Sequence, residues 1–465
     1  MPFSDYLEKR RADCKELVCR LREYFDYVSV LGTDVKETAY RADKRSSAAQ
    51  DAGGECGFVV KMNSKKAFYE YSLDDISGDK KALAKRIAEE VSVTQSLSDR
   101  AINAAAIEDE PMKKDFCRET DFSDHDDEEL LGFCRNISER IGKEDEKVLN
   151  AIGMIRTLSV SKIFVTENRE LTQHYGWVNG FLFAVFNDGK LVQARKVFGE
   201  GTLKAVLDKM DGAVGAVVDL ARHLAKAKQV VPGVYDVITH PSVTGLIAHE
   251  AFGHGVEMDQ FVKDRALAKN YVGKYVASPI TNMHDGAEAA YSVASYFFDD
   301  DGVLAHDTQI IKDGVLVAGL SDLASAMQLK TEPTGNGRRE SFKRKAYSRM
   351  TNTFFTPGKD KVEDMIASIK HGYMLFDTNN GMEDPKNWQI QCTAEYGIEI
   401  VDGKLTDNYV TPVVMSGYVP DLLKSISMVS DEFEVFGSGM CGKGHKEWVR
   451  VSDGGPHLKV SVKLG

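Results

Sequence analysis

The 465-residue sequence has no excess of basic residues, which argues against one broad class of function. It carries 71 acidic residues against 59 basic ones, so its formal net charge is -12. A protein that follows the phosphates of a nucleic acid normally has a basic excess, because each phosphate contact is made by a lysine or an arginine. The composition therefore predicts no direct binding to nucleic acid.

Long apolar runs and paired cysteines are also missing. The longest strongly apolar stretch, residues 176–187, is well short of the ~20 residues that cross a bilayer. The N-terminus is charged from its fifth residue and shows no apolar core of a signal peptide. The seven cysteines are scattered with no CxxC spacing, which favours a reducing compartment. We expect a cytoplasmic protein with no membrane span.

Proline is scarce as well, with 11 residues, while 43% of the chain is apolar. Together with the length, this composition favours a globular chain of two or three domains. Periodicity predicts helices over about 6–24, 80–98 and 214–228. Alternation and turn signals predict a hairpin over 57–72 and an antiparallel meander over 157–199. Beyond residue 232 the pattern is strand-rich with one conspicuous helix.

One segment is strongly acidic. Residues 108–129 hold eleven acidic and three basic residues. A third helix is predicted to start near Asp126, with acidic residues in its first turn, where the helix dipole favours them. We interpret the acidic block either as a solvated linker or as a docking face for a second subunit.

The most informative segment is THPSVTGLIAHEAFGHGVEMD, residues 239–259, which predicts a helix carrying His249, Glu250 and His254. The spacing is HExxxH rather than HExxH. Positions five apart lie about 140° apart around a regular helix, so a straight helix would not aim both imidazoles at one ion. Gly253 and Gly255 allow the helix to end, bend or widen into a π-type turn. With both histidines as zinc ligands, Glu250 is placed to accept a proton from an activated water.

A catalytic zinc usually has a third protein ligand. The glycine-rich segment FGSGMCGKGHKEW near the C-terminus offers Cys441, whose thiolate suits zinc, and His445 as a competing ligand. A buried apolar role is the common alternative for an isolated cysteine. The flanking glycines and Lys443 fit that alternative poorly.

Three motifs together resemble the TldD/PmbA family of modulator-of-gyrase metallopeptidases, and specifically its catalytic, TldD-type member. The motifs are HEAFGHGVE, GNGRRESFKRKAYSRMTNTFFTPG and GSGMCGKG. The resemblance implies that His249, His254 and Cys441 bind one zinc ion and that Glu250 is the general base. A GGQVD-like run expected for the family is missing from residues 376–388, which puts substrate contacts there in doubt.

The family resemblance also implies the fold and the partners. We expect an α+β fold with an N-terminal α/β domain, residues 1–225, and a C-terminal, mostly antiparallel β domain, residues 226–465, that carries the HExxxH helix. The implied substrates are short or unfolded peptides. The implied assembly is a homodimer, or a heterodimer with a related subunit that lacks HExxxH.

Further candidates lie around these motifs. Arg338, Arg339 and Arg349, in a segment with six basic residues and one acidic residue, are candidates to bind a peptide's carboxylate or acidic side chains. A solvated basic loop is the alternative. His445 and Arg349 are candidate oxyanion donors. Glu257 is a candidate to orient a ligand imidazole, or only a charge at a helix end.

The sequence as a whole predicts a zinc-dependent peptidase. Two other interpretations remain. One is a non-catalytic, peptide-binding subunit of a heterodimeric protease, and the other is a regulatory zinc protein that acts on a topoisomerase. A non-catalytic subunit would lack a ligand or the glutamate, whereas all four residues of the predicted site are present here. A structural zinc site normally has four protein ligands, whereas this sequence supplies three ligands plus a base, which favours catalysis.

Overall fold

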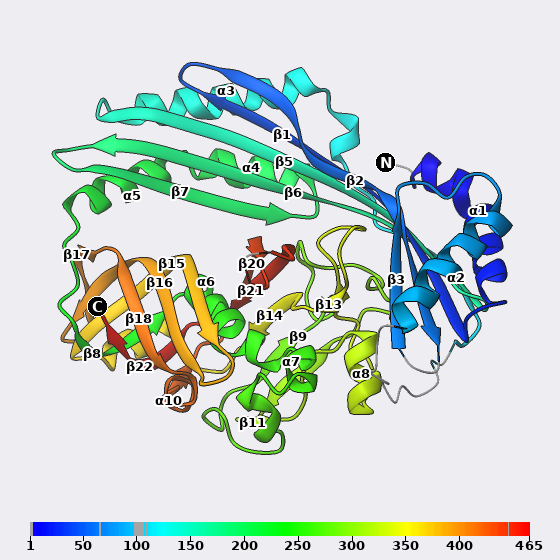
Figure 1. Ribbon diagram of the computed structural model, residues 1–465. Helices are drawn as coiled ribbons and strands as arrows, with labels where there is room; N and C mark the ends of the chain where they lie inside the picture. Colours follow the sequence, from blue (N-terminus) through cyan, green and yellow to red (C-terminus); the bar gives the residue numbers. More distant parts are fainter. Residues whose placement is uncertain (1–2, 65–66, 97–106, 108, 445) are drawn as a thin grey trace.

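A computed structural model describes residues 3–64, 67–96, 107, 109–444 and 446–465. Figure 1 shows a long, curved sheet built from the N-terminal half, which lies across two smaller sheets built from the C-terminal half. Helices and largely antiparallel sheets occur together, so the predicted α+β class is confirmed.

The long sheet has the strand order β3-β2-β1-β5-β6-β4, with β7 also paired to β6. Strands β5 and β6 pair antiparallel over almost their whole length. The strands are β1 (Tyr27–Asp43), β2 (Ser47–Ser64), β3 (Ala67–Leu73), β4 (Met112–Cys117), β5 (Val148–Val165), β6 (Arg169–Asn187) and β7 (Leu191–Glu200).

Helices cover the outer face of this sheet (Figure 1). Helix α3 starts after Asp126, whose side chain accepts a hydrogen bond from the backbone N–H of Glu129, and it buries Leu130, Ile137 and Ile141 against the sheet. The helices of this half are α1 (Asp5–Leu21), α2 (Lys80–Ser96), η1 (Phe122–Asp124), α3 (Asp127–Glu144), α4 (Leu203–Gly212) and α5 (Val214–Lys226). The predicted helices, hairpin and meander are confirmed, although residues 97–98 of the helix predicted over 80–98 lie outside the described residues. Strand β1 and helix α4 were not predicted.

The acidic block contains structure that the linker interpretation did not include. Residues 112–117 form β4, which pairs in parallel with β6 at the edge of the long sheet. Its side chains are intermediate or exposed, as suits an edge strand with polar residues. The block is therefore not a linker throughout, and a docking role for its exposed acids stays a prediction.

The C-terminal half forms two main sheets and a two-stranded pair. One sheet has the order β11-β10-β9-β14-β21-β20, and the other has the order β15-β8-β22-β18-β16-β17, with β19 paired to β22. Most pairings are antiparallel, but β14 with β21 and β15 with β8 are parallel. The strands are β8 (Gly233–Thr239), β9 (Met283–Asp285), β10 (Thr308–Lys312), β11 (Val315–Leu316), β12 (Gly337–Arg338), β13 (Tyr347–Ser348), β14 (Asn352–Phe355), β15 (His371–Asp384), β16 (Gln389–Val401), β17 (Lys404–Val410), β18 (Val413–Tyr418), β19 (Met428–Val429), β20 (Glu434–Cys441), β21 (Val449–Gly455) and β22 (Leu458–Leu464).

The largest buried core lies in this half, around the central helical segment. The helices are α6 (Pro241–Leu246), η2 (Ile247–Gly253), η3 (His254–Val256), α7 (Met258–Val262), η4 (Leu267–Asn270), α8 (Leu323–Leu329), α9 (Val362–Ala367) and α10 (Val419–Lys424). The strands of the long sheet all precede residue 201, and those of the other sheets all follow residue 232. A domain boundary at 225/226 stays a prediction.

Candidate metal centre

The HExxxH segment lies in one continuous helical stretch between the two smaller sheets. His240 caps it by accepting the backbone N–H of Ser242, and Pro241 occupies the first turn, where no backbone donor is needed. The stretch packs against β15 on one side and against β14 and β21 on the other. Its side chains are almost all buried, so the stretch is held from every direction.

The histidine spacing is accommodated by a change of helix type. Residues 247–253 are π-helical, and the backbone N–H of His254 donates to the carbonyl of His249, five residues earlier. A wider turn places residues five apart above one another, which a regular helix does not do. The two imidazole rings lie with their centroids 5.2 Å apart and nearly perpendicular.

Cys441, at the end of β20, completes the group. The ligand atoms of His249, His254 and Cys441 all lie within 4.8 Å of one another. The thiol Sγ is 3.3 Å from Nε2 of His254. The side chains of His249 and Cys441 are buried, and only 17% of the His254 side chain is exposed.

The electrostatics of this group favour a thiolate. Burial raises the pKa of Cys441, but the neighbouring charges of His249 and His254 outweigh burial and lower that pKa to about 4. Burial opposes the charged form of His254, yet the Cys441 thiolate and Glu257 raise the pKa of its imidazole well above the ordinary value. The Cys441 thiolate therefore lies close to imidazoles that its negative charge helps to keep protonated.

A second layer of charged side chains holds these ligands. Arg349, which is fully buried, donates to the carbonyl oxygen of Cys441 at 2.8 Å and to its Sγ at 3.0 Å. Glu257 lies 3.4 Å from Nδ1 of His254, 3.3 Å from Nε of Arg349 and 3.0 Å from Nζ of Lys443. A partner at Nδ1 fixes the tautomer of an imidazole and leaves Nε2 to bind an ion.

Glu250 lies beside the histidines, with Oε2 3.9 Å from Nε2 of His254. Burial raises its pKa. Gly381, on β15, leaves room for its side chain, because a Cβ at that position would lie 2.5 Å from Cγ of Glu250. The backbone of the hairpin β15–β16 can thus lie close to Glu250, the predicted general base, because Gly381 has no side chain.

The other predicted site residues are placed differently. Arg338 donates to the carbonyl of Met350 at 2.6 Å, and the buried Arg339 pairs with Glu70 at 3.2 Å. Together with Arg349, both are bound within the protein, and their contact with substrate stays a prediction. His445 lies outside the described residues.

Sequence reasoning missed the carboxyl of Glu383. Both of its oxygens are buried, and neither has a hydrogen-bond partner among the described residues. Burial raises its pKa well above the ordinary value, and the charges of Glu250 and Glu257 add to this rise although His254 opposes it. The signal that could have pointed to Glu383 is its place in residues 376–388, where the expected family run is missing.

The residues present fit a zinc ion. Two imidazoles and a low-pKa thiolate are a donor set that zinc commonly binds. Nδ1 of His249 is buried and has no hydrogen-bond partner among the described residues, and buried polar atoms without a partner call for an explanation such as an ion.

Comparison with known proteins agrees with this chemistry. A family model described as the PmbA/TldA metallopeptidase C-terminal domain matches residues 232–464, half of the chain. A "Metalloprotease" of Methanothermobacter thermautotrophicus is 31% identical over 60% of this chain and 61% of its own length. A "Zinc metalloprotease TldD homolog" of Saccharolobus solfataricus is 31% identical over 50% of this chain and 52% of its own. The chain thus spans about half to three fifths of these relatives.

The fold extends the likeness to the whole chain. The crystal structure of TldE from Thermococcus kodakarensis has a TM-score of 0.76 with 18% identity, covering 97% of this chain and 100% of that one. The family model and the curated relatives place the chain in a class of metallopeptidases. The chain belongs to the PmbA/TldD family, as its motifs predict. Among the described residues, no helix is long and apolar enough to cross a membrane.

Proposed function

We propose that this chain is a zinc-dependent peptidase that hydrolyses peptide bonds in short or unfolded peptides. The observation that carries the proposal is the meeting of His249, His254 and Cys441 beside Glu250 in a member of a metallopeptidase family. The zinc in the name of the Saccharolobus relative supports the choice of metal.

His249, His254 and Cys441 would hold the ion. The chemistry that zinc supplies when bound is Lewis-acid polarisation of the scissile carbonyl and activation of a water molecule. Glu250 accepts the proton of the attacking water and passes it to the leaving amine. Its burial raises the pKa of its carboxyl, which makes it a better proton acceptor than an exposed glutamate.

The surrounding residues keep these groups in place. Glu257 accepts from Nδ1 of His254 and orients the ring. Arg349 donates to the backbone and sulfur of Cys441, which fixes the end of β20. Lys443 adds a second cation beside Glu257, so this carboxylate stays charged although it is buried.

The Glu250→Gln variant tests the mechanism. We expect cleavage of an unfolded peptide mixture to fall by about 10²–10⁴-fold, because the amide cannot accept the proton. One zinc per chain should remain, since Glu250 is not a ligand. Cleavage is followed by mass spectrometry and zinc by elemental analysis. Glu363→Gln, in the exposed first turn of α9, is the matched control.

Two outcomes would count against this proposal. Undiminished cleavage by the Glu250→Gln protein would sink the mechanism. Failure of the unaltered, zinc-loaded chain to cleave any peptide would favour a peptide-binding or regulatory role.

We also propose that the chain works as a dimer, located in the cytoplasm. The likeness to a protein named TldE supports a related subunit as partner. Mass measurement of the purified chain, paired with its activity, tests this. An active homodimer would remove the need for a second type of subunit, whereas an inactive chain that gains activity with a related subunit lacking HExxxH would establish a heterodimer.

A further inference from the structure

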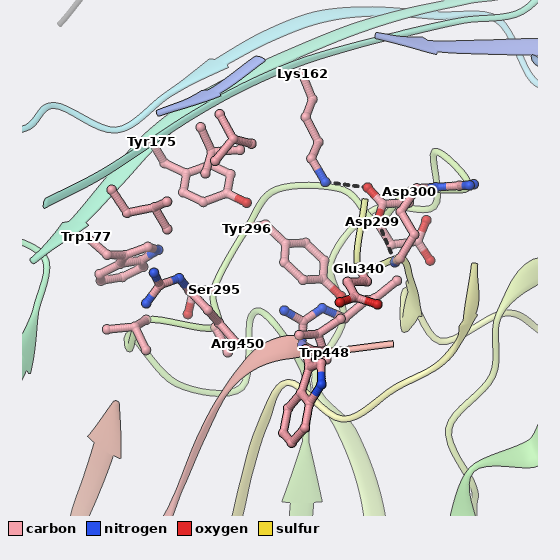
Figure 2. A pocket seen from close by; sticks show the side chains of 18 of the residues that line it. Lys162, Tyr175, Trp177, Ser295, Tyr296, Asp299, Asp300, Glu340, Trp448 and Arg450 are labelled. Carbon is pink, nitrogen blue, oxygen red and sulfur yellow. Dashed lines mark hydrogen bonds and ion pairs between the residues drawn. The ribbon is translucent and has the colours of Figure 1, made fainter. Parts of the chain in front are cut away.

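A cavity lies between the long sheet and the C-terminal half. Figure 2 shows Lys162, Tyr175 and Trp177 entering it from strands β5 and β6, while Tyr296, Glu340 and Trp448 enter it from the other side. Its volume is about 200 Å³, below the ~300–1,000 Å³ of sites for drug-sized ligands. The cavity suits a single side chain rather than a large cofactor.

Each of the four cations in its wall is already bound within the protein. Lys162 pairs with Asp300, and Arg450 pairs with Glu37 at 2.7 Å. Arg338 and Arg339, the other two cations of the lining, are bound to Met350 and Glu70. Because each cation has a partner, an anionic ligand would have to break an existing ion pair or hydrogen bond. The cavity favours a neutral occupant.

The uncharged part of the lining combines aromatic rings with aliphatic side chains. Tyr175, Trp177, Tyr296 and Trp448 line the cavity from both sides. Aromatic rings gain most from a further ring placed edge-on or offset against them. The indole N–H of Trp177 is buried without a hydrogen-bond partner among the described residues.

The cavity and the His249, His254 and Cys441 group share one β ribbon. Met440 lines the cavity and is half exposed, whereas the next residue, Cys441, is buried in the metal group. Successive residues of a strand face opposite sides. Across the ribbon, Met440 pairs with Arg450 and Cys441 pairs with Val449, and both Arg450 and Val449 belong to the cavity wall. The two sites are separate but adjacent.

A series of hydrogen bonds also connects the cavity wall to the metal group. Glu340, in the cavity wall, accepts the backbone N–H of Glu447 at 2.9 Å. The carbonyl of Glu447 accepts from Arg349, which also holds Cys441. A peptide anchored in the cavity therefore lies next to the backbone that positions the metal group.

We propose that this cavity is a binding site for an aromatic side chain of a peptide, distinct from the metal centre. The occupant is a phenylalanine or tyrosine side chain, held by the four aromatic walls. The choice of a peptide as occupant rests on the proposed peptidase function. Binding in the cavity requires no hydrolysis, so it can be tested without measuring cleavage.

The three tryptophans of the chain provide the probe. Trp177 and Trp448 line the cavity, while Trp388 is fully buried against Phe252 and Tyr271 elsewhere. The full chain carrying Glu250→Gln, so that no peptide is consumed, is titrated with a capped alanine peptide containing one phenylalanine. We expect a saturable change in tryptophan fluorescence, and at least about ten-fold weaker binding of the all-alanine peptide.

Variants locate the site. Val35→Phe fills the cavity from β1 and should weaken binding at least about ten-fold, whereas Val234→Phe, at a position 72% exposed on β8, should not. Trp448→Ala removes one half-exposed wall, and its binding, followed by calorimetry, should also weaken. Circular dichroism confirms that each variant is folded. Equal binding of both peptides, or unchanged binding in folded Val35→Phe and Trp448→Ala, would overturn the proposal. Peptide cleavage by the unaltered chain is measured separately. A failure of the binding proposal can therefore be distinguished from a failure of the proposed peptidase function.

Discussion

At the scale of single residues, Glu257 links a ligand of the metal centre to two cations. It is 1% exposed and contacts His254, Arg349 and Lys443. Burial opposes its charge, but Lys443 and His254 lower the pKa of its carboxyl. A carboxylate at this point neutralises the buried Arg349 and the partly exposed Lys443, and it orients one ligand.

Glu257→Gln should therefore lower both stability and metal affinity. Removing one charge from a buried ion pair costs about 3–5 kcal/mol of unfolding free energy, and losing the partner of a ligand imidazole costs about 10–100-fold in metal affinity. Urea unfolding and zinc titration measure the two effects. Glu89→Gln, which breaks an exposed pair with Lys85, should change stability by less than about 1 kcal/mol. Equal losses in both variants would remove Glu257 from this role.

His240 predicts a dependence of stability on pH. Burial, with help from His457 and Lys196, lowers its pKa to about 3, against ~6.5 in the unfolded chain. Between these values the unfolded state binds the extra proton, so the stabilisation is complete above pH ~6.5 and is lost as pH falls toward ~3. His240→Asn keeps an oxygen to cap α6 and should flatten unfolding free energy against pH, measured with chelator present. Parallel curves would contradict this.

The residue scale also shows what the sequence could reveal. The two histidines, Glu250 and Cys441 were predicted because zinc chemistry demands particular residue types in recognisable motifs. The buried position of Arg349 against Cys441 was not predicted, since these residues are 92 positions apart and belong to separate motifs. A basic segment alone does not tell which of its side chains turns inward.

At the scale of elements, the π-helical η2 depends on close packing at Gly253. A Cβ at this position would lie 2.1 Å from Sδ of Met350, on the segment before β14. The predicted widening of the helix rested on the flexibility of glycine. The structure gives a further reason, because a neighbouring side chain occupies the space that a side chain at 253 would need.

Gly253→Ala should destabilise the protein by about 1–3 kcal/mol, because it overpacks a filled core, and should weaken zinc binding. Denaturant unfolding and zinc titration provide the readouts. Combining Gly253→Ala with Met350→Ala should cost less than the sum of the single variants, since the clash is gone. Gly132→Ala, in α3 with no atom within 4 Å of the new Cβ, should instead stabilise by about 0.5–1 kcal/mol. Strict additivity would argue against the proposed contact.

Elements were predicted unevenly for a physical reason. Helices with capping residues and amphipathic spacing, such as α3, carry their signal locally. The exposed part of β2 has no alternation to follow, because residues 47–51 are exposed on both faces. Strand β4 was hidden by its charge, since an edge strand needs little apolar surface.

At the scale of the whole molecule, buried ion pairs join the long sheet to the C-terminal half. Lys61 on β2 is 4% exposed and pairs with the buried Asp301 at 2.6 Å. The two residues are 240 positions apart, which is why no local pattern predicts the contact. The charge of Asp301 raises the pKa of Lys61 although burial opposes it.

Lys61→Met should cost about 3–5 kcal/mol of stability, because it leaves a buried carboxylate without its partner. Adding Asp301→Asn should recover part of the loss. Lys147→Met, which breaks a surface pair with Asp188, should change stability by no more than about 1 kcal/mol. Thermal or urea unfolding of the four proteins is the measurement. If Lys61→Met behaves like the surface variant, the pair does not fasten the two halves.

The π-helical turn of η2 also bears on how this chain tolerates changes in length. This turn contains about one residue more than a turn of a regular α-helix. Deleting one residue from it could therefore restore a regular helix. Removing Ala251 would turn HExxxH into HExxH and let a regular helix carry both histidines on one face. Because one π-type turn takes up one extra residue, the residues after His254 would keep nearly the same direction around the helix axis. Deletion of Ala251 is therefore the shortening that this stretch tolerates best, since Glu257 would still follow His254 at the same spacing.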